Sequence, residues 1–141
     1  YDFDVLGVWN FYYACKQGRF KGVKDDDCLE WTAIRRYTKQ LKNDCLFGGD
    51  WNFGPTFSQK SFIEMCGMFD EVGYSSLYHV HQKLDWAETN HVTYRTPTKR
   101  YHHLDHFFGS SMFVSQMKEY EILDVDEAVL SDHSPIILTL N

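Results

Sequence analysis

Length, composition and charge limit what this chain can be. Its 141 residues are the length of one domain and bury roughly two-thirds of the surface that the unfolded chain exposes. Fourteen basic and 20 acidic residues give a net charge of −6, which argues against a sequence-independent grip on nucleic acid through overall positive charge. With 43% hydrophobic and 24% charged residues, the composition also argues against a disordered, collagen-like or coiled-coil chain.

Aromatic residues are unusually frequent, and the 11 Phe, nine Tyr and four Trp favour a sheet-rich interior. Apolar runs stay well short of the roughly 18 residues of a membrane span, and we find no secretory signal. The chain opens at Tyr1 inside an apparent strand, so we expect the natural protein to continue upstream. The cysteines lack the close pairing of zinc sites, and we predict buried free thiols in a reducing compartment, the cytoplasm. They are Cys15, Cys28, Cys45 and Cys66.

The first half of the chain alternates predicted strands and helices. Residues 3–14 carry few charges and are predicted as a strand buried on both faces. A loop over 16–27 leads to a helix over 28–41, which Asp27 caps. A short strand over 45–52 follows, and Thr56 or Ser58 caps a second helix that ends before Gly73. The inner face of this second helix is predicted to be Phe62, Ile63, Cys66 and Phe69.

Strands dominate the second half. Residues 92–95 and 101–108 are predicted as two strands joined across 96–99, and residues 118–123 alternate as a third. The last strand is predicted over 136–140, after the polar segment 131–135. Because helices interleave with strands early and strands dominate late, the fold class is α/β, a sandwich in which helices cover sheets.

The first polar cluster, at the end of the 45–52 strand, contains Asp50 and Asn52. Positions two apart in an extended chain face the same way, so a carboxylate and a carboxamide are expected side by side. A carboxylate binds a hard cation, and an amide can orient a nucleophile or donate to a phosphate oxygen. The alternative is an ordinary turn, since Gly, Asp and Asn favour turns.

The second cluster lies in the strand predicted over 101–108. Asp105 stands between apolar residues, and burying it requires a histidine, a cation or several amide donors as partner. A half-exposed edge strand is the alternative. His102, His103 and His106 also suggest a zinc site, although adjacent residues of a strand diverge.

The third cluster is Asp132 and His133 within 131–135. Neighbouring side chains point to opposite faces of an extended chain, so one can hold a metal ion while the other moves a proton. By itself the segment is equally an ordinary loop. Together, the three clusters supply a metal carboxylate, an amide, a histidine and an acid to orient it, which are the parts that phosphoester hydrolysis needs.

These motifs resemble the endonuclease/exonuclease/phosphatase superfamily, which includes abasic-site endonucleases, pancreatic deoxyribonuclease, sphingomyelinases and inositol-polyphosphate 5-phosphatases. The resemblance rests on the runs 49–52, 103–108 and 131–135 in that order. Runs 73–79 and 93–94 are most similar to uncharacterised bacterial members. Trp51 stands where the family has Phe, and His106 where a Tyr is common.

The resemblance implies a divalent-metal-dependent phosphoester hydrolase, a phosphodiesterase or endonuclease that uses Mg²⁺ or Mn²⁺. Asp50 and Asn52 match residues that position the attacking water, contact the phosphate and bind metal. His133 matches the histidine that protonates or stabilises the phosphoryl oxygens, Asp105 its orienting carboxylate and Asp132 a metal ligand. Substrate contacts are expected from Asn52 and from two further residues, Tyr12 and His103. A basic strip adds local attraction for a phosphoester substrate such as nucleic acid, and consists of Arg95, Lys99, Arg100 and Lys118.

The resemblance covers residues 1–141 but only the C-terminal half of the family's four-layer, deoxyribonuclease-like α/β sandwich. The family's principal metal-binding Glu and its N-terminal strands lie upstream of Tyr1. We therefore expect self-association, or complementation by the missing half, to cover an open sheet face. A non-catalytic binding or scaffold fragment of the same fold is the alternative function.

Overall fold

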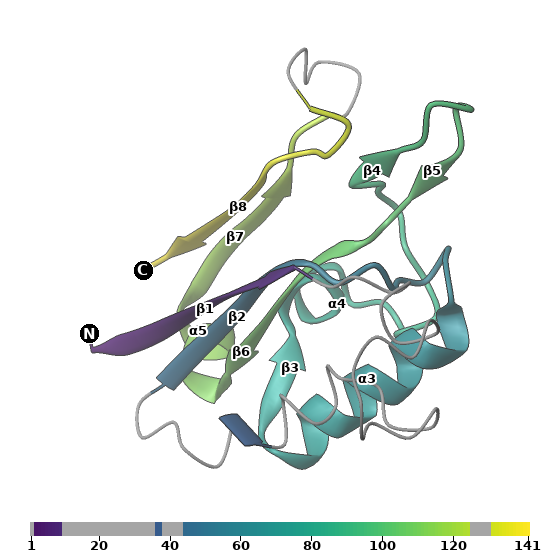
Figure 1. Ribbon diagram of the computed structural model, residues 1–141. Coiled ribbons are helices and arrows are strands. Elements are labelled where there is room, and N and C mark those ends of the chain that lie inside the picture. Colours follow the sequence, from purple (N-terminus) through teal and green to yellow (C-terminus); the bar gives the residue numbers. More distant parts are fainter. Residues whose placement is uncertain (1, 10–35, 38–43, 125–130) are drawn as a thin grey trace.

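The computed structural model describes residues 2–9, 36–37, 44–124 and 131–141, and its main feature is a four-stranded sheet (Figure 1). The strand order is β1-β2-β6-β3, with β1 parallel to β2 and with β6 antiparallel to both of its neighbours. The strands are β1 (Phe3–Trp9), β2 (Asp44–Asp50), β3 (Tyr74–Ser76) and β6 (Asp105–Ser110).

Two hairpins extend from this sheet. One is a short ribbon that projects at one end of the molecule (Figure 1), built from β4 (Tyr94–Arg95) and β5 (Tyr101–His102). The other pairs β7 (Met117–Ile122) with β8 (Ile136–Leu140).

The hydrophobic core has two parts, one on each face of the four-stranded sheet. On one face, helix α3 (Gln59–Glu71) packs its buried side chains against the strands. On the other face lie α4 (Leu77–Gln82), α5 (Ser111–Gln116) and the β7–β8 hairpin, packed on Leu46 and Phe107 of the sheet. The described chain is therefore layered as helix, sheet, and a mixed layer of helices and hairpin.

Helix α3 forms where the apolar spacing predicts it. Its buried residues recur at three- and four-residue intervals, and they are Phe62, Met65, Cys66 and Phe69. Ser58 precedes the helix in a left-handed conformation at φ 53°, and Gly73 follows it at φ 84°, a value that glycine adopts without strain. Phe69 stacks on Phe108 of β6 with ring centroids 4.2 Å apart, which fixes the helix on the sheet.

The predicted fold class, the strands near 45–52, 118–123 and 136–140, and the helix after Ser58 are confirmed. The single strand predicted over 101–108 is wrong, because the segment forms two strands of different sheets, β5 and β6, which His103 and Leu104 separate. Helices α4 and α5 and strand β3 are further elements that the sequence analysis missed. The 16–27 loop and most of the 28–41 helix lie outside the described residues.

The prediction that the first strand is buried on both faces is also wrong for its described part, β1. Leu6 and Val8 pack against the core beneath α3, whereas the alternate side chains of Phe3, Val5 and Trp9 are 39%, 63% and 70% exposed. Among the described residues, only the face of β1 that carries Leu6 and Val8 is therefore packed against the core, and β1 is also an edge strand of the sheet.

Cys45 and Cys66 are free and buried, as predicted, and Cys15 and Cys28 lie outside the described residues. Among the described helices, none has the length and apolar character needed to cross a lipid bilayer.

Candidate active site

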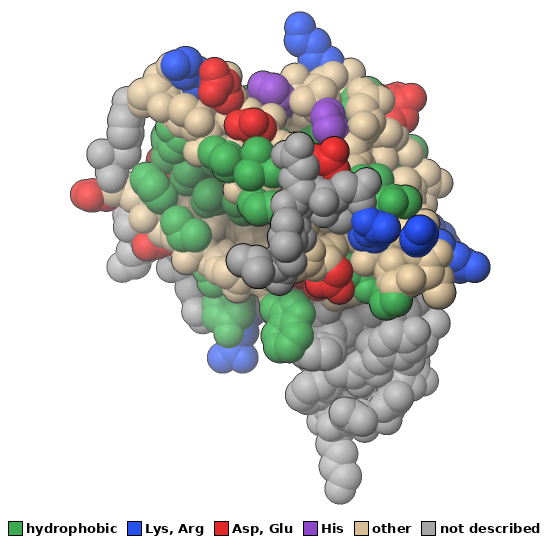
Figure 2. Space-filling view, turned by 90° about the horizontal axis from the view of Figure 1, so that it is seen from above, with side chains coloured by type: hydrophobic (Ala, Val, Ile, Leu, Met, Phe, Trp, Pro, Cys, Tyr) green, Lys and Arg blue, Asp and Glu red, His purple; other side chains and the backbone are tan. Residues whose placement is uncertain are grey.

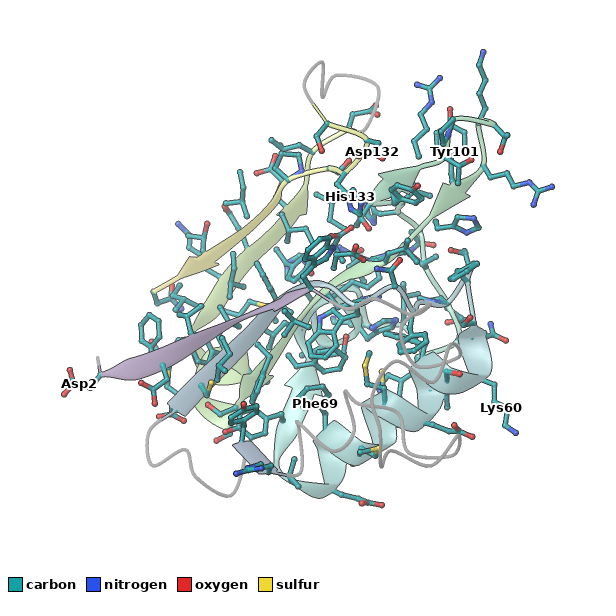
Figure 3. The ribbon with its side chains drawn as sticks, in the orientation of Figure 1. Asp2, Lys60, Phe69, Tyr101, Asp132 and His133 are labelled. Atoms are coloured by element: carbon teal, nitrogen blue, oxygen red, sulfur yellow. The ribbon has the colours of Figure 1, made fainter. Side chains whose placement is uncertain are left out.

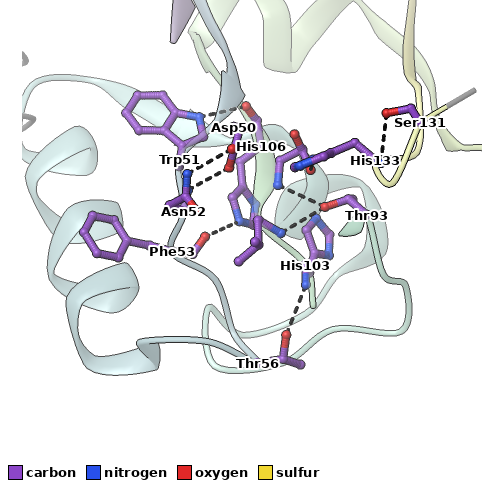
Figure 4. A network of polar contacts seen from close by, with 12 residues as sticks. Asp50, Trp51, Asn52, Phe53, Thr56, Thr93, His103, His106, Ser131 and His133 are labelled. Atoms are coloured by element: carbon purple, nitrogen blue, oxygen red, sulfur yellow. Dashed lines mark hydrogen bonds and ion pairs between the residues drawn. The ribbon is translucent and has the colours of Figure 1, made fainter. Parts of the chain in front are cut away.

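Asp50 and Asn52 lie side by side in a tight turn at the end of β2 (Figure 4). The backbone N–H of Asn52 donates to Oδ1 of Asp50, and its side-chain Nδ2 donates to Oδ2, both at 2.9 Å. Asn52 adopts φ 52°, a left-handed conformation. A turn, rather than the extended chain that was predicted, therefore brings the two groups together. The backbone N–H and the side-chain amide of Asn52 therefore hold the two oxygens of the Asp50 carboxylate in a fixed orientation.

Trp51, between these two residues, anchors the turn in the core. It is 1% exposed, and its indole Nε1–H donates to the carbonyl of His106 at 3.0 Å. Its backbone N–H donates to the carbonyl of Leu104, also at 3.0 Å. A Phe in this position has no indole N–H, so the Trp adds a bond from the turn to β6.

Asp105 lies beside Asp50 on the neighbouring strand and pairs with His133. The β2–β6 register places Asp50 directly opposite Asp105. The loop before β8 brings His133 to the same place, where its Nδ1–H donates to Oδ2 of Asp105 at 2.9 Å. This bond fixes the tautomer and leaves Nε2 as the nitrogen available to a reacting group. Asp105 thus has the histidine partner that its burial was predicted to require.

Electrostatics link these three residues. The hydrogen bond to Asp105 raises the pKa of His133, opposed by burial and supported by the charges of Asp105, Asp50 and Asp132. Burial raises the pKa of Asp50, and so does the Asp105 charge, while Asn52 and His133 lower it. The charges of Asp50, Asp105 and His133 therefore influence one another, although the three residues come from segments far apart in the sequence.

Two neighbours shape the surroundings of His133. The Tyr94 ring lies against the imidazole with centroids 4.6 Å apart, and the backbones of the two residues form a bridge. Asp132 is exposed, and its carbonyl accepts from the backbone N–H of Arg95 at 2.9 Å. Figure 3 shows Asp132 and His133 at the same end of the molecule as Tyr101 of the β4–β5 hairpin.

His103 and His106 are 0% exposed, so they are core residues. Their rings stack at 4.6 Å with an interplanar angle of 2°, and Phe62 stacks on the other side of His106 at 4.4 Å. This burial argues against the predicted substrate contact through His103. The zinc alternative also fails for the described residues, where no three metal-ligating side chains are gathered. In a continuous strand, His103 and His106 would point to opposite faces, and a histidine by itself does not indicate burial. The sequence therefore did not predict this stack.

The remaining predicted residues lie on the surface outside the Asp50–Asp105–His133 cluster or outside the described residues. Tyr12 falls outside the described residues. Lys99 and Arg100 are exposed on the β4–β5 hairpin, and Arg95 lies over the Tyr101 ring at 5.7 Å. Lys118 is exposed on β7. Viewed from above, this end of the molecule presents basic, acidic and histidine side chains on one face (Figure 2).

No protein-family model and no curated protein sequence matches the chain. Solved structures do match it. The 3′ phosphatase NExo from Neisseria, bound to a product DNA hairpin, is 14% identical with a TM-score of 0.57, over 79% of this chain and 50% of that one. The endonuclease domain of TRAS1, a telomere-specific non-LTR retrotransposon, is 18% identical with a TM-score of 0.57, over 83% and 53%.

The 3′–5′ exonuclease NExo from Neisseria meningitidis is similar to the same degree, with 16% identity and a TM-score of 0.54 over 78% of this chain and 50% of that one. The chain therefore shares the α/β fold of these nuclease and phosphatase structures, as predicted from the sequence. It spans about half the length of each matched structure.

Proposed function

We propose that this chain is the C-terminal part of a single domain that hydrolyses phosphoester bonds, with nucleic acid as the substrate class. One observation carries the proposal: Asp50, Asp105 and His133 converge at one end of the sheet, with the imidazole bonded to Asp105 at 2.9 Å. A carboxylate that can take a proton beside a histidine that can give one is the arrangement that general acid–base hydrolysis requires.

In the proposed reaction, water attacks phosphorus and the ester P–O bond breaks. Asp50, held by Asn52, orients the water and accepts its proton. His133 presents Nε2–H to a phosphoryl or leaving oxygen, while Asp105 fixes the ring through Nδ1–H. Donors that point to the position where negative charge develops are the largest electrostatic contribution such a site can make.

A divalent cation, Mg²⁺ or Mn²⁺, belongs to this proposal, but the described residues do not form a complete metal centre. Asp50, Asn52 and Asp132 carry the hard oxygen donors that such ions prefer. However, the described residues gather no three metal-ligating His, Cys, Asp or Glu side chains, and both oxygens of Asp50 already accept from Asn52. The ion would neutralise phosphoryl charge, with further ligands from outside these residues.

Nucleic acid is favoured by the charge beside the site and by the neighbours. Lys99 and Arg100 project on the β4–β5 hairpin next to the loop of His133, so a polyanion meets positive charge there despite the acidic total. The similar structures include a phosphatase bound to a DNA hairpin and an endonuclease domain.

The edge strand β1 supports the proposed domain boundaries. Among the described strands, β1 pairs with β2 alone and leaves Val5 63% exposed. We propose that further strands of the same domain, or a second copy of the chain, cover this edge.

The test is hydrolysis by the full-length protein of bis(4-nitrophenyl) phosphate, of plain DNA and of abasic DNA, with Mg²⁺ and with chelator. We expect turnover that chelator abolishes and that Asp50→Asn reduces by on the order of 10²-fold or more. Chelator-insensitive turnover would contradict the metal, and a folded protein without turnover on any substrate favours the scaffold alternative.

A further inference from the structure

Thr93, one residue before β4, is fully buried and makes four hydrogen bonds, of which Figure 4 shows the two to its hydroxyl. Its hydroxyl oxygen accepts from the backbone N–H groups of Leu104 at 2.9 Å and of Asp105 at 3.0 Å. Its carbonyl accepts from the N–H of Ser134 at 2.7 Å, and its own N–H donates to the carbonyl of His102 at 2.8 Å. One residue is therefore bonded to the segment of Asp105 and to that of His133.

The hydroxyl acts where the chain passes from one sheet to another. Strand β5 pairs with β4 and ends at His102, and β6 begins at Asp105 in the four-stranded sheet. At such a crossing, buried backbone N–H groups have no strand partner and require another acceptor. The Thr93 hydroxyl is that acceptor for two consecutive N–H groups, the second of which belongs to Asp105 itself.

The backbone of the same segment holds His133. The Ser134 N–H is bonded to the Thr93 carbonyl, Tyr94 forms a backbone bridge with His133, and the Arg95 N–H donates to the carbonyl of Asp132. Backbone bonds from residues 93–95 thus hold the chain on both sides of His133. The 2.9 Å bond between Nδ1 of His133 and Asp105 is formed between two segments that Thr93 joins.

We infer that Thr93 is a positioning residue that sets the Asp105 carboxylate against the His133 imidazole through its hydroxyl. Its effect on catalysis rests on the proposed function, whereas its effect on the geometry of the pair does not. A valine has nearly the same shape and keeps the backbone bonds, but it removes the acceptor and leaves two N–H groups unpaired.

The test compares Thr93→Val with Thr93→Ser, which keeps the hydroxyl. The matched control is Thr96→Val, which removes a hydroxyl that accepts from the Arg100 N–H at 2.9 Å on the exposed part of the same hairpin. The first readout is the proton resonance of His133 Nδ1–H, which a bond to a carboxylate moves downfield. We expect this resonance in the wild type, Thr93→Ser and Thr96→Val, and its loss or upfield movement in Thr93→Val.

The second readout is kinetic. Thr93→Val should lower kcat by about tenfold or more with KM within about twofold, because a misplaced pair weakens the chemical step and not ground-state binding. Thr93→Ser and Thr96→Val should keep the wild-type kcat. An unchanged His133 resonance in folded Thr93→Val would overturn the inference, even if the protein is a hydrolase. A resonance that moves in a protein without turnover supports the inference and counts against the proposed function.

Amide exchange in the wild type covers the case in which Thr93→Val does not fold. The N–H groups of Leu104 and Asp105 should exchange at least about a hundredfold more slowly than the exposed N–H of Thr98. Exchange of both at the rate of Thr98 would mean that the hydroxyl bonds do not persist, and it would overturn the inference without any variant.

Discussion

Acidification to about pH 5 should strongly destabilise this protein, because three histidines are buried as neutral imidazoles. His79, His103 and His106 are at most 3% exposed. Burial lowers the pKa of His79 to about 4 and that of His103 to about 3, and it lowers the pKa of His106 well below its ordinary value. His79 and His106 are bonded to the carbonyls of Glu88 and Phe53, and these bonds offset the lowering of the two pKa values only in part.

The magnitude follows from linkage between protonation and folding. In the unfolded chain each histidine titrates near 6.5, so below that pH the unfolded state binds protons that the folded state refuses. Between pH 6.5 and 5 this amounts to between about 1 and 2 kcal/mol for each histidine and to about 5 kcal/mol for the three. His133 has the opposite sign, because its raised pKa adds stability at low pH, and it offsets part of this loss.

The measurement is urea unfolding, followed by tryptophan fluorescence, at several pH values between about 7.5 and 5 at constant ionic strength. His106→Gln removes one titrating ring and keeps an N–H for the Phe53 carbonyl. It should lose about a third of the pH dependence, whereas His81→Gln, at an exposed residue of α4, should keep all of it. A free energy of unfolding that stays constant to within about 1 kcal/mol over this range would mean that the three histidines are not held as buried neutral imidazoles.

Three further outcomes are expected. Asp105→Asn keeps the shape of the side chain but removes the charge that orients His133, so turnover should fall on the order of 10²-fold or more while the melting temperature changes little. Gly54→Ala places a methyl group on the His103 carbonyl and should destabilise the protein by about 2 kcal/mol or more, whereas Gly67→Ala, in open space on α3, should stabilise it by up to about 1 kcal/mol. Phe69→Ala, at a fully buried ring, should cost about 3–5 kcal/mol in urea unfolding, and a loss below about 1 kcal/mol would mean that α3 does not pack as described.

Local patterns in the sequence predicted the parts of the fold that local physics decides. The spacing of apolar residues located α3, and the run of apolar residues before Asp50 located β2. The spacing of Asp50 and Asn52 also predicted that these side chains lie together, although a left-handed Asn52 and not an extended chain brings them there. A histidine partner for the partly buried Asp105 followed from the cost of burying a lone charge.

Long-range contacts decided the rest. Between β5 and β6, the backbone N–H groups of Leu104 and Asp105 are bonded to the hydroxyl of Thr93, which lies about ten residues earlier in the chain. The buried stack of His103 and His106 depends on Phe62 of α3 and has no sequence pattern. Residues of β1 look like those of an interior strand, and the packing of the described residues shows that one face of it is exposed.

The most direct test of the central claim compares two histidine variants of the full-length protein in the hydrolysis of DNA. His133→Ala removes the imidazole that Asp105 holds, and His81→Ala removes an exposed imidazole of α4. We expect His133→Ala to lower the rate on the order of 10²-fold or more with its folding retained, and His81→Ala to leave the rate unchanged. A folded His133→Ala variant that hydrolyses DNA at the wild-type rate would mean that His133 takes no part in the reaction.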